Sequence, residues 1–311
     1  MSRIGEIARS LTSDLEGDLQ FISQNGLKAR HHELMVPTLN NLEIRLVDET
    51  RQKSGSFKYR GAVLGVRDSR RGVVACGSGN FPIAVGQAAS DLAVPALLVM
   101  PDDAPERKKQ LACQSGPETL FVPRAQFVQT AKEEADARGW NALHPFHDPG
   151  MLLGSCTLGI EIAEAIAAFG SPKDAVLVAC GGGGLAAGMT IGLRLRGAAN
   201  PVYVVEPKTH PRLAAARAAG HPIEIIPTEL TRCDALRATK IGYLAFDAIG
   251  SLDVSLTTAT DEGVLAAQSL MAERCKVFAE PSGALALAAV LEGQIPGHHD
   301  RVWVVVCGGN T

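Results

Sequence analysis

Apolar residues recur at helical spacing in the first part of the chain and at strand spacing soon afterwards. One or two helices are predicted within residues 4–24, from Ile4, Ile7, Ala8, Leu11 and Leu15. Apolar and polar residues then alternate over residues 42–47, which predicts a strand. This strand leads to residues 54–61, Ser-Gly-Ser-Phe-Lys-Tyr-Arg-Gly, where we expect a helix to begin.

From residue 72 onward the pattern changes to short continuous apolar runs, each followed by a stretch with helical pattern. These runs lie at residues 73–76, 95–100, 119–122, 175–180, 202–206 and 302–306. Continuous apolar runs that alternate with helices are typical of parallel strands covered on both faces. We therefore predict an α/β fold with two open, mostly parallel twisted sheets flanked by helices. A small domain of residues 67–147 is expected to be inserted into a large domain made of residues 1–66 and 148–311.

Length and composition are those of a globular protein. The 311 residues suffice for two domains, and 46% of them are apolar and 20% charged. The net charge is −3 and the sequence has no run of basic residues, so it gives no sign of the positive surface that binds nucleic acid. Charged residues, Gly or Pro interrupt every apolar run, so we expect no membrane span, and the N-terminus lacks the apolar core of a signal peptide. Seven widely spaced cysteines without a Cys-x-x-Cys pair favour a cytoplasmic setting over a disulfide framework or a zinc site.

The segment around Lys58 allows two interpretations of this residue. Ser is a good N-cap and Lys is tolerated in helices, so residues 54–61 could be an ordinary helix start. Alternatively, Lys58 is a partly buried amine whose neutral form is accessible, as a Schiff base with a carbonyl-bearing cofactor requires. The segment alone does not decide between the two.

Four consecutive glycines, at positions 181–184, follow a predicted strand and precede a predicted helix. They allow backbone N–H groups to approach an anion, and the helix N-terminus adds partial positive charge. A structural turn needs fewer glycines, and each one costs conformational entropy. We therefore expect a phosphate group to bind there.

The same stretch also fits a dinucleotide-binding fingerprint. Gly182, Gly184 and Ala187 form a Gly-x-Gly-x-x-Ala pattern, and Glu206 closes the next strand, where a ribose-binding acid would lie. A nicotinamide-dependent oxidoreductase is therefore an alternative from another class, although it gives Lys58 no role.

A third candidate segment is Gly77-Ser78-Gly79-Asn80-Phe81-Pro82, which directly follows the predicted strand 73–76. Ligands of open α/β sheets bind at the carboxyl ends of the strands, so this segment is expected to face a ligand. Ser, Gly and Asn are also common in turns, so the alternative is that this segment is only a turn.

Together these motifs resemble the serine/threonine dehydratase and serine racemase family, which are pyridoxal-phosphate enzymes of the tryptophan-synthase-like fold. The matching segments follow the family's order from about residue 37 to the end of the chain. They are Ser-Phe-Lys58-x-Arg-Gly, Ser78-Gly-Asn80, the glycines 181–184, Glu280-Pro-Ser-Gly-Ala and Cys307-Gly-Gly-Asn.

The resemblance implies that the large domain binds pyridoxal 5'-phosphate. Lys58 would hold the cofactor aldehyde, Phe57 would pack against its ring, and Asn80 would hydrogen-bond its phenolic oxygen. Other cofactor contacts are implied for Gly181, Gly182, Gly183, Gly184, Leu185, Ala235, Glu280 and Cys307. The implied substrate-binding residues are Ser54, Ser78, Gly79, Asn80 and Phe81.

The implied activity is that of a lyase that releases ammonia from a β-hydroxy amino acid. The freed amine of Lys58 would remove the α-proton as a general base, and the cofactor would stabilise the carbanion. Cys307 would face the pyridine nitrogen, and its weakly polar thiol gives a weaker electron sink than a carboxylate. Prompt loss of the β-hydroxyl, protonated by the cofactor phosphate, would then lead to a 2-oxo acid.

Ser78 keeps a second activity open. In the racemases of this family a Ser at this place acts on the face opposite the lysine, so an amino-acid racemase using Lys58 and Ser78 is the nearest alternative. The Ser could equally bind the substrate carboxylate or cap a helix. A catalytically silent regulatory protein is disfavoured, because the proposed base and phosphate site are both intact.

Two segments depart from the family pattern near the expected substrate. Phe81 stands where the family usually has His, and Gly154-Ser155-Cys156-Thr157 replaces Gly-Gln-Gly-Thr. Both changes argue against serine and threonine as substrates. Phe81 better suits a bulkier or more apolar β-hydroxy amino acid.

We predict no metal site. The racemase-like members hold a divalent cation with a Glu, a carbonyl and an Asp after a strand that ends in Glu-Pro. Here Glu206-Pro207 is kept, but Arg212 stands at the Asp position, where it cannot ligate a hard cation and could itself supply the positive charge. Turn and surface roles explain the histidines considered as ligands, His144, His147, His298 and His299.

The expected partners are a small-molecule amino acid and, by the resemblance, a second copy of the chain in a homodimer. Neither nucleic acid nor a membrane is expected. Biosynthetic threonine dehydratases carry a regulatory domain beyond the terminal Cys307-Gly-Gly-Asn motif, so feedback control by isoleucine is not expected.

Overall fold

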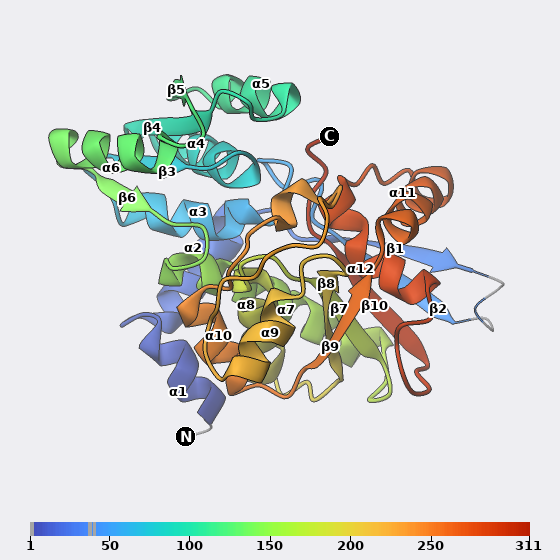
Figure 1. The fold of residues 1–311 in the computed structure, drawn as a ribbon. Coiled ribbons are helices and arrows are strands. Elements are labelled where there is room, and N and C mark those ends of the chain that lie inside the picture. The colour runs from blue at the N-terminus through green and yellow to red at the C-terminus, as the bar shows by residue number, and fades with distance from the viewer. Residues whose placement is uncertain (1–2, 37–38, 40–41) are drawn as a thin grey trace.

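The computed structural model describes residues 3–36, 39 and 42–311, which form two β-sheets with helices around them (Figure 1). The larger sheet has the order β1-β2-β10-β7-β8-β9. β1 is antiparallel to β2, and the other neighbouring strands are parallel. Its strands are β1 (Arg30–Met35), β2 (Glu43–Asp48), β7 (Ala175–Ala179), β8 (Val202–Pro207), β9 (Ser255–Ala259) and β10 (Arg301–Val306).

The smaller sheet is entirely parallel and has the order β5-β4-β3-β6. Its strands are β3 (Val73–Cys76), β4 (Ala96–Pro101), β5 (Glu118–Val122) and β6 (Asn141–Leu143). It lies with α4, α5 and α6 above the rest of the molecule in Figure 1.

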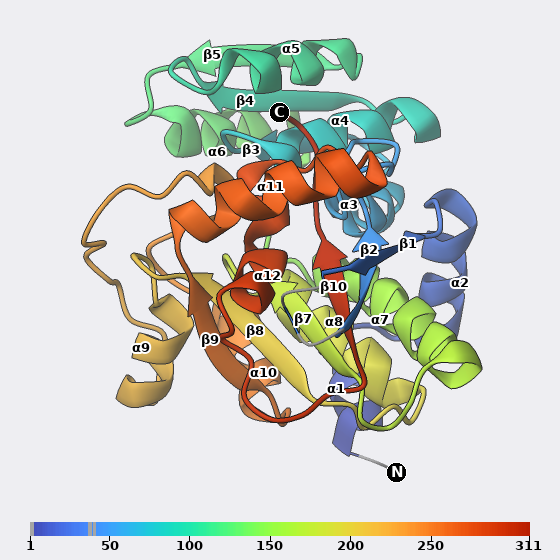
Figure 2. The same ribbon diagram turned by 90° about the vertical axis from the view of Figure 1, so that its right-hand side faces the viewer.

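Helices cover both faces of each sheet, as the continuous apolar strands require. α7, α8 and α10 share one apolar cluster with the larger sheet, whereas α11 and α12 lie against its other face (Figure 2). α6 packs on one face of the smaller sheet, and α4 packs on the other. The helices are α1 (Arg3–Ser10), α2 (Leu15–Asn25), α3 (Lys58–Arg67), α4 (Asn80–Leu92), α5 (Glu106–Gln114), α6 (Phe127–Arg138), α7 (Pro149–Phe169), α8 (Gly184–Leu195), α9 (Arg212–Ala219), α10 (Tyr243–Gly250), α11 (Asp261–Cys275), α12 (Pro281–Leu291) and the short 3₁₀ helix η2 (Asp234–Leu236).

The predicted fold class is confirmed, and each strand predicted from an apolar run is present. Three strands were missed. β1 reads Arg-His-His-Glu-Leu-Met and is mostly polar, β9 carries Ser and Thr on an edge of the sheet, and β6 has three residues. α7 begins at Pro149, because the side chain of Asp148 caps that helix and Pro149 suits its first turn.

α7 also corrects the expectation that no segment could span a membrane. With 21 residues it is long and apolar enough to do so by length and composition alone. Its residues 150–159 are buried, and it packs against α3 and α8. The apolar residues of this buried part therefore belong to the protein's own core, whereas Phe169 at the end of the helix is exposed.

Arg60, in the first turn of α3, anchors that helix through a buried ion cluster. Its guanidinium donates to both carboxylate oxygens of Glu49, just after β2, at 2.8 Å each. It also donates to both oxygens of Glu161 on α7, at 2.8 and 3.0 Å. The Arg60 side chain is only 1% exposed and Glu49 is fully buried, so each charge depends on its partners for compensation.

Arg60→Met is expected to lower the free energy of unfolding by about 3–5 kcal/mol, because it leaves the Glu49 carboxylate buried without its partner. Urea denaturation measures this change. Arg138→Met is the matched control, since Arg138 also binds two carboxylates, Glu118 and Glu134, but at the surface. Its loss should cost less than about 1 kcal/mol. Equal losses in the two variants would contradict the anchoring role of Arg60.

Candidate active site

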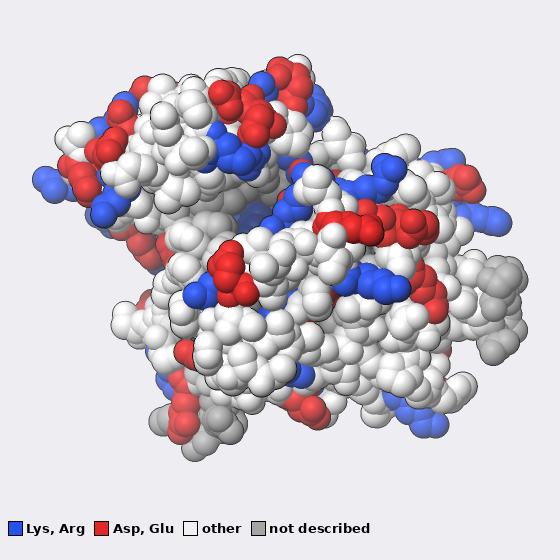
Figure 3. Space-filling model, in the orientation of Figure 1, with Lys and Arg blue, Asp and Glu red and all other residues white. Residues whose placement is uncertain are grey.

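A cavity of about 320 Å³ lies between the smaller sheet and the rest of the protein. The molecule is hollowed at this place in the space-filling view (Figure 3). The segments that follow β3, β7 and β10 all contribute to its wall. The carboxyl ends of parallel strands from both sheets therefore meet at one site, as expected for ligand binding in open α/β folds.

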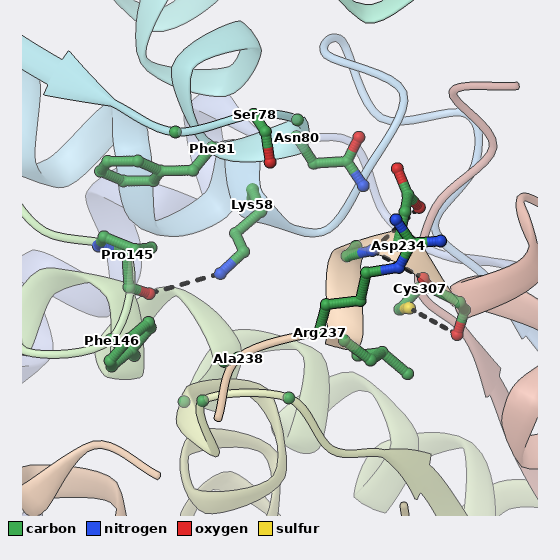
Figure 4. Close-up of a pocket in the computed structure, with 18 of the residues that line it drawn as sticks. Lys58, Ser78, Asn80, Phe81, Pro145, Phe146, Asp234, Arg237, Ala238 and Cys307 are labelled. Atoms are coloured by element: carbon green, nitrogen blue, oxygen red, sulfur yellow. Dashed lines mark hydrogen bonds between the residues drawn. The ribbon is translucent and has the colours of Figure 1, made fainter. Parts of the chain in front are cut away.

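Lys58 is the first residue of α3 and extends into the cavity (Figure 4). The N–H of its neighbour Phe57 donates to the carbonyl of Cys307 at 3.0 Å, which ties this helix start to the end of β10. The Lys58 amine donates to the carbonyl of Pro145 at 3.3 Å. Burial lowers the pKa of Lys58 to about 8, with a smaller opposing effect from Cys307. The neutral amine is therefore accessible near neutral pH.

The glycine loop, residues 181–184, connects β7 to α8 along one side of the cavity. Gly183 has a positive φ of 92° and caps α8, so this turn favours glycine. A Cβ at Gly182 would lie 2.5 Å from the ring of Phe146. Any side chain there would push Phe146 aside, and so the glycines keep the backbone open at the positive end of α8.

The segment after β3 faces the same cavity with Ser78, Gly79, Asn80 and Phe81 (Figure 4). Asn80 donates to Glu280 Oε1 at 2.5 Å and accepts from the amide of Asn310 at 2.9 Å. This network joins the smaller-sheet side of the cavity to the side formed by the larger sheet.

Cys307 and Ala235 are linked through Ser282. The Cys307 thiol donates to the Ser282 carbonyl at 3.6 Å, and the Ser282 hydroxyl accepts from the N–H of Ala235 at 3.1 Å. Burial raises the pKa of the Cys307 thiol well above its usual value. Cys307 is therefore a neutral thiol at the cavity wall.

Lys108, from α5, is a cavity residue that sequence reasoning missed. Its amine lies 2.6 Å from Asp234 Oδ2 and 3.1 Å from Glu280 Oε2. Burial alone would lower the pKa of Lys108, but Glu280 and Asp234 outweigh it and raise the pKa. Its sequence, Glu-Arg-Lys-Lys-Gln, gives no sign that this Lys is buried while Lys109 beside it lies near the surface. Arg124 and Arg237 also line the cavity and were missed.

The cavity brings together every predicted site residue except Ser54. Ser54 is buried in the turn before α3, where its carbonyl accepts from Asn310, and it does not line the cavity. Ser155, at the position of the family's Gln, also lies outside the cavity wall and donates to the Met151 carbonyl within α7. Of the two departures from the family pattern, only Phe81 lies at the cavity.

Arg212, which stands at the position of the Asp that the resemblance assigns to a cation in racemase-like members, is buried, and its guanidinium lies 3.2 Å from Glu206 Oε1. Within residues 3–36, 39 and 42–311, no group of three or more His, Cys, Asp or Glu side chains is arranged to hold a metal ion.

Comparisons with known proteins agree on one family. The family model described as pyridoxal-phosphate dependent enzyme matches residues 33–308. L-threonine ammonia-lyase of Thermotoga maritima is 30% identical over 275 residues, which cover 86% of this chain and 67% of that protein. Serine racemase of Schizosaccharomyces pombe is 30% identical over 270 residues, covering 85% and 82%. The solved structure of T.th. threonine deaminase matches with a TM-score of 0.87 at 31% identity, covering 96% of this chain and 98% of that one.

The cavity residues fit pyridoxal phosphate on two observations. Lys58 provides an amine whose pKa of about 8 leaves a fraction of it neutral near physiological pH, and the neutral form is the one that bonds to an aldehyde. The glycine loop provides a helix N-terminus without side chains, where backbone N–H groups can bind a phosphate.

Gly183→Ala is expected to weaken binding of pyridoxal phosphate by about tenfold or more. It strains a positive φ, and its Cβ would lie 2.8 Å from that of Ala245, which displaces the loop. The cofactor dissociation constant is measured by absorbance titration. Gly197→Ala is the matched control, because its φ of 76° is also positive but its Cβ would have nothing within 4 Å. Equal cofactor affinity in the two variants would contradict the role of the loop.

Proposed function

Because this chain belongs to the family of pyridoxal-phosphate-dependent enzymes, we propose that it is an ammonia-lyase that converts a β-hydroxy amino acid to a 2-oxo acid and ammonia. The family match confirms the expected cofactor and removes the nicotinamide-dependent alternative. The observation that carries the proposal is the partly buried Lys58 amine, with its lowered pKa, in the same cavity as the glycine loop. The similarity to a threonine ammonia-lyase supports the reaction class.

The cofactor, when bound, supplies an aldehyde for the substrate's amino group and an electron sink for its α-carbon. We propose that Lys58 binds the aldehyde and that Asn80 hydrogen-bonds the phenolic oxygen. The phosphate would be bound by residues 181–184 of the glycine loop together with Leu185. Phe57 and Ala235 would lie on opposite faces of the ring. Glu280 would act on the same ring indirectly, because its carboxylate accepts a hydrogen bond from the amide of Asn80.

Lys58 is the proposed general base at the α-carbon. An amine with a pKa of about 8 is partly neutral at physiological pH and can both take and return a proton. The Pro145 carbonyl accepts one of its hydrogens and so orients the amine within the cavity. Lys58 needs no second base to activate it.

Cys307 is the proposed partner of the pyridine nitrogen. Its thiol stays protonated, because burial raises its pKa, and it already donates to the Ser282 carbonyl. A neutral thiol does not hold a proton on the ring nitrogen as a carboxylate does. This weaker electron sink favours loss of the β-hydroxyl over a long-lived carbanion.

An amino-acid racemase is the second candidate, and Ser78 is the observation in its favour. Ser78 lines the cavity together with Lys58, and one similar protein is a serine racemase. In this candidate Ser78 returns a proton to the face opposite Lys58. In the lyase, Ser78 and Gly79 bind the substrate carboxylate.

Phe81 supports a β-hydroxy amino acid with a bulkier, more apolar side chain than serine or threonine. It is 5% exposed and lines the cavity with Pro145 and Phe146, which together form an apolar wall (Figure 4). An apolar wall favours a substrate methyl or aryl group by desolvation and offers a hydroxyl no hydrogen bond.

We also propose a small domain of residues 67–147, a large cofactor-binding domain of residues 1–66 and 148–311, and a cytoplasmic homodimer. The smaller sheet, within residues 73–143, supports the domain division. All seven cysteines are free thiols, which supports a reducing compartment.

Protein loaded with pyridoxal phosphate is expected to release a 2-oxo acid from an L-β-hydroxy amino acid, and Lys58→Ala should lose this activity by at least about 100-fold. Coupled detection of 2-oxo acid across L- and D-substrates measures it. Lys53→Ala is the matched control, since Lys53 is exposed and pairs with Asp91. If the protein exchanges the α-proton of a substrate without releasing 2-oxo acid, the proposed lyase is wrong and the racemase is favoured.

Phe81→His is expected to shift specificity toward threonine. The ratio of kcat/KM for threonine to that for phenylserine should rise by about 10-fold or more, because an imidazole adds a polar contact and removes apolar contact area. Steady-state kinetics of both substrates measure the ratio. An unchanged ratio would show that Phe81 does not contact the substrate side chain.

A further inference from the structure

Four oxygen atoms converge on the buried guanidinium of Arg212, the first residue of α9. Its side chain is fully buried. The Nε group donates to Glu206 Oε1 at 3.2 Å, and Nη2 donates to the Cys180 carbonyl at 3.2 Å. The Nη1 group donates to the carbonyls of Leu236 at 2.5 Å and Ala238 at 2.6 Å. One side chain thereby joins three separate segments of the chain.

Two of these segments are walls of the cavity. Cys180 directly precedes the glycine loop, and residues 236–238 directly follow Ala235, on the proposed other face of the cofactor ring. The two walls already touch, since a Cβ at Gly181 would lie 3.1 Å from a methyl group of Leu236. Arg212 binds a carbonyl on each wall and so fixes their separation.

The third segment, at the end of β8, holds Arg212 in place. The carboxylate of Glu206 accepts from the N–H groups of Leu213 at 2.9 Å and Ala214 at 3.2 Å, both in the first turn of α9. The Glu206 carboxylate also balances the charge of Arg212 away from water. Glu206 thus fixes the position of the guanidinium, which then binds carbonyls on both walls.

A cationic donor suits this arrangement. One carboxylate and three carbonyl oxygens surround the guanidinium as acceptors, and they would repel one another without a positively charged donor between them. The planar guanidinium supplies up to five N–H donors in fixed directions, so it can serve four acceptors at once.

We propose that Arg212 is a positioning residue for the cofactor, a built-in cation that fixes the glycine loop against the 235–238 wall and makes cofactor affinity independent of divalent metal ions. The inference rests on the proposed function of the glycine loop as the phosphate site. It extends that function by assigning control of cofactor affinity to a side chain that does not touch the cofactor.

Arg212→Met is expected to raise the dissociation constant of pyridoxal phosphate by at least about tenfold, with the absorbance titration of cofactor-stripped protein as the readout. Arg212→Lys should give an intermediate value, because one ammonium cannot reach all three segments. Arg194→Met is the matched control. Arg194 also binds carbonyls, those of Ala198 and Asn200, but at the far end of α8, and its loss should leave cofactor affinity unchanged.

Chemical rescue separates positioning from general loss of stability. Guanidinium ion at low millimolar concentration should restore cofactor affinity in Arg212→Ala, whereas sodium ion should not. If the unpaired Glu206 carboxylate prevents folding, Arg212→Met combined with Glu206→Gln removes both charges, and this double variant should fold but still bind the cofactor weakly.

The outcomes separate this inference from the proposed function. If native protein binds the cofactor and folded Arg212→Met binds it equally tightly, the inference is overturned and the proposed function stands. Loss of affinity in native protein treated with a metal chelator would also overturn the inference. If native protein does not bind pyridoxal phosphate at all, the proposed function itself fails.

Discussion

The ion cluster of Arg60 with Glu49 and Glu161 fixes the helix that begins with Lys58. Arg60 lies two residues after Lys58, so holding its guanidinium holds the first turn of α3. Close packing completes the constraint, because a Cβ at Gly154 of α7 would lie 2.2 Å from the backbone of Gly61. The position of the amine is thereby set by buried charge on one side of α3 and by backbone contact on the other.

Two lysines at the same cavity show how environment sets the role of one residue type. Lys58 has a carbonyl oxygen as its hydrogen-bond partner, and burial lowers its pKa to about 8. Lys108 is buried too, but Asp234 and Glu280 raise its pKa and keep it charged. The first is suited to proton transfer and covalent chemistry, and the second to joining α5 to the opposite wall of the cavity.

Local sequence was sufficient for the elements whose pattern is strong and for the motifs that are contiguous. The Val-rich run of β10 and the glycines 181–184 could be recognised without a structure, as could Lys58 behind its Ser-Gly-Ser turn. The polar strand β1 could not, because its pairing with β2 is set by tertiary contacts rather than by its own composition. Lys108 and Arg124 could not either, since contacts between distant segments place them at the cavity. Ser54 lies near Lys58 in sequence, but it is buried in the turn before α3 and does not line the cavity, and the short spacing between the two residues could not show this.

The central claim is that Lys58 carries the cofactor. Borohydride reduction of the protein loaded with pyridoxal phosphate, followed by proteolysis and mass spectrometry of the peptides, tests it directly. We expect a single reduced cofactor adduct on the peptide that contains Lys58, formed in one equivalent per chain. An adduct on Lys108 or on any other lysine, with Lys58 unmodified, would show that Lys58 does not carry the cofactor.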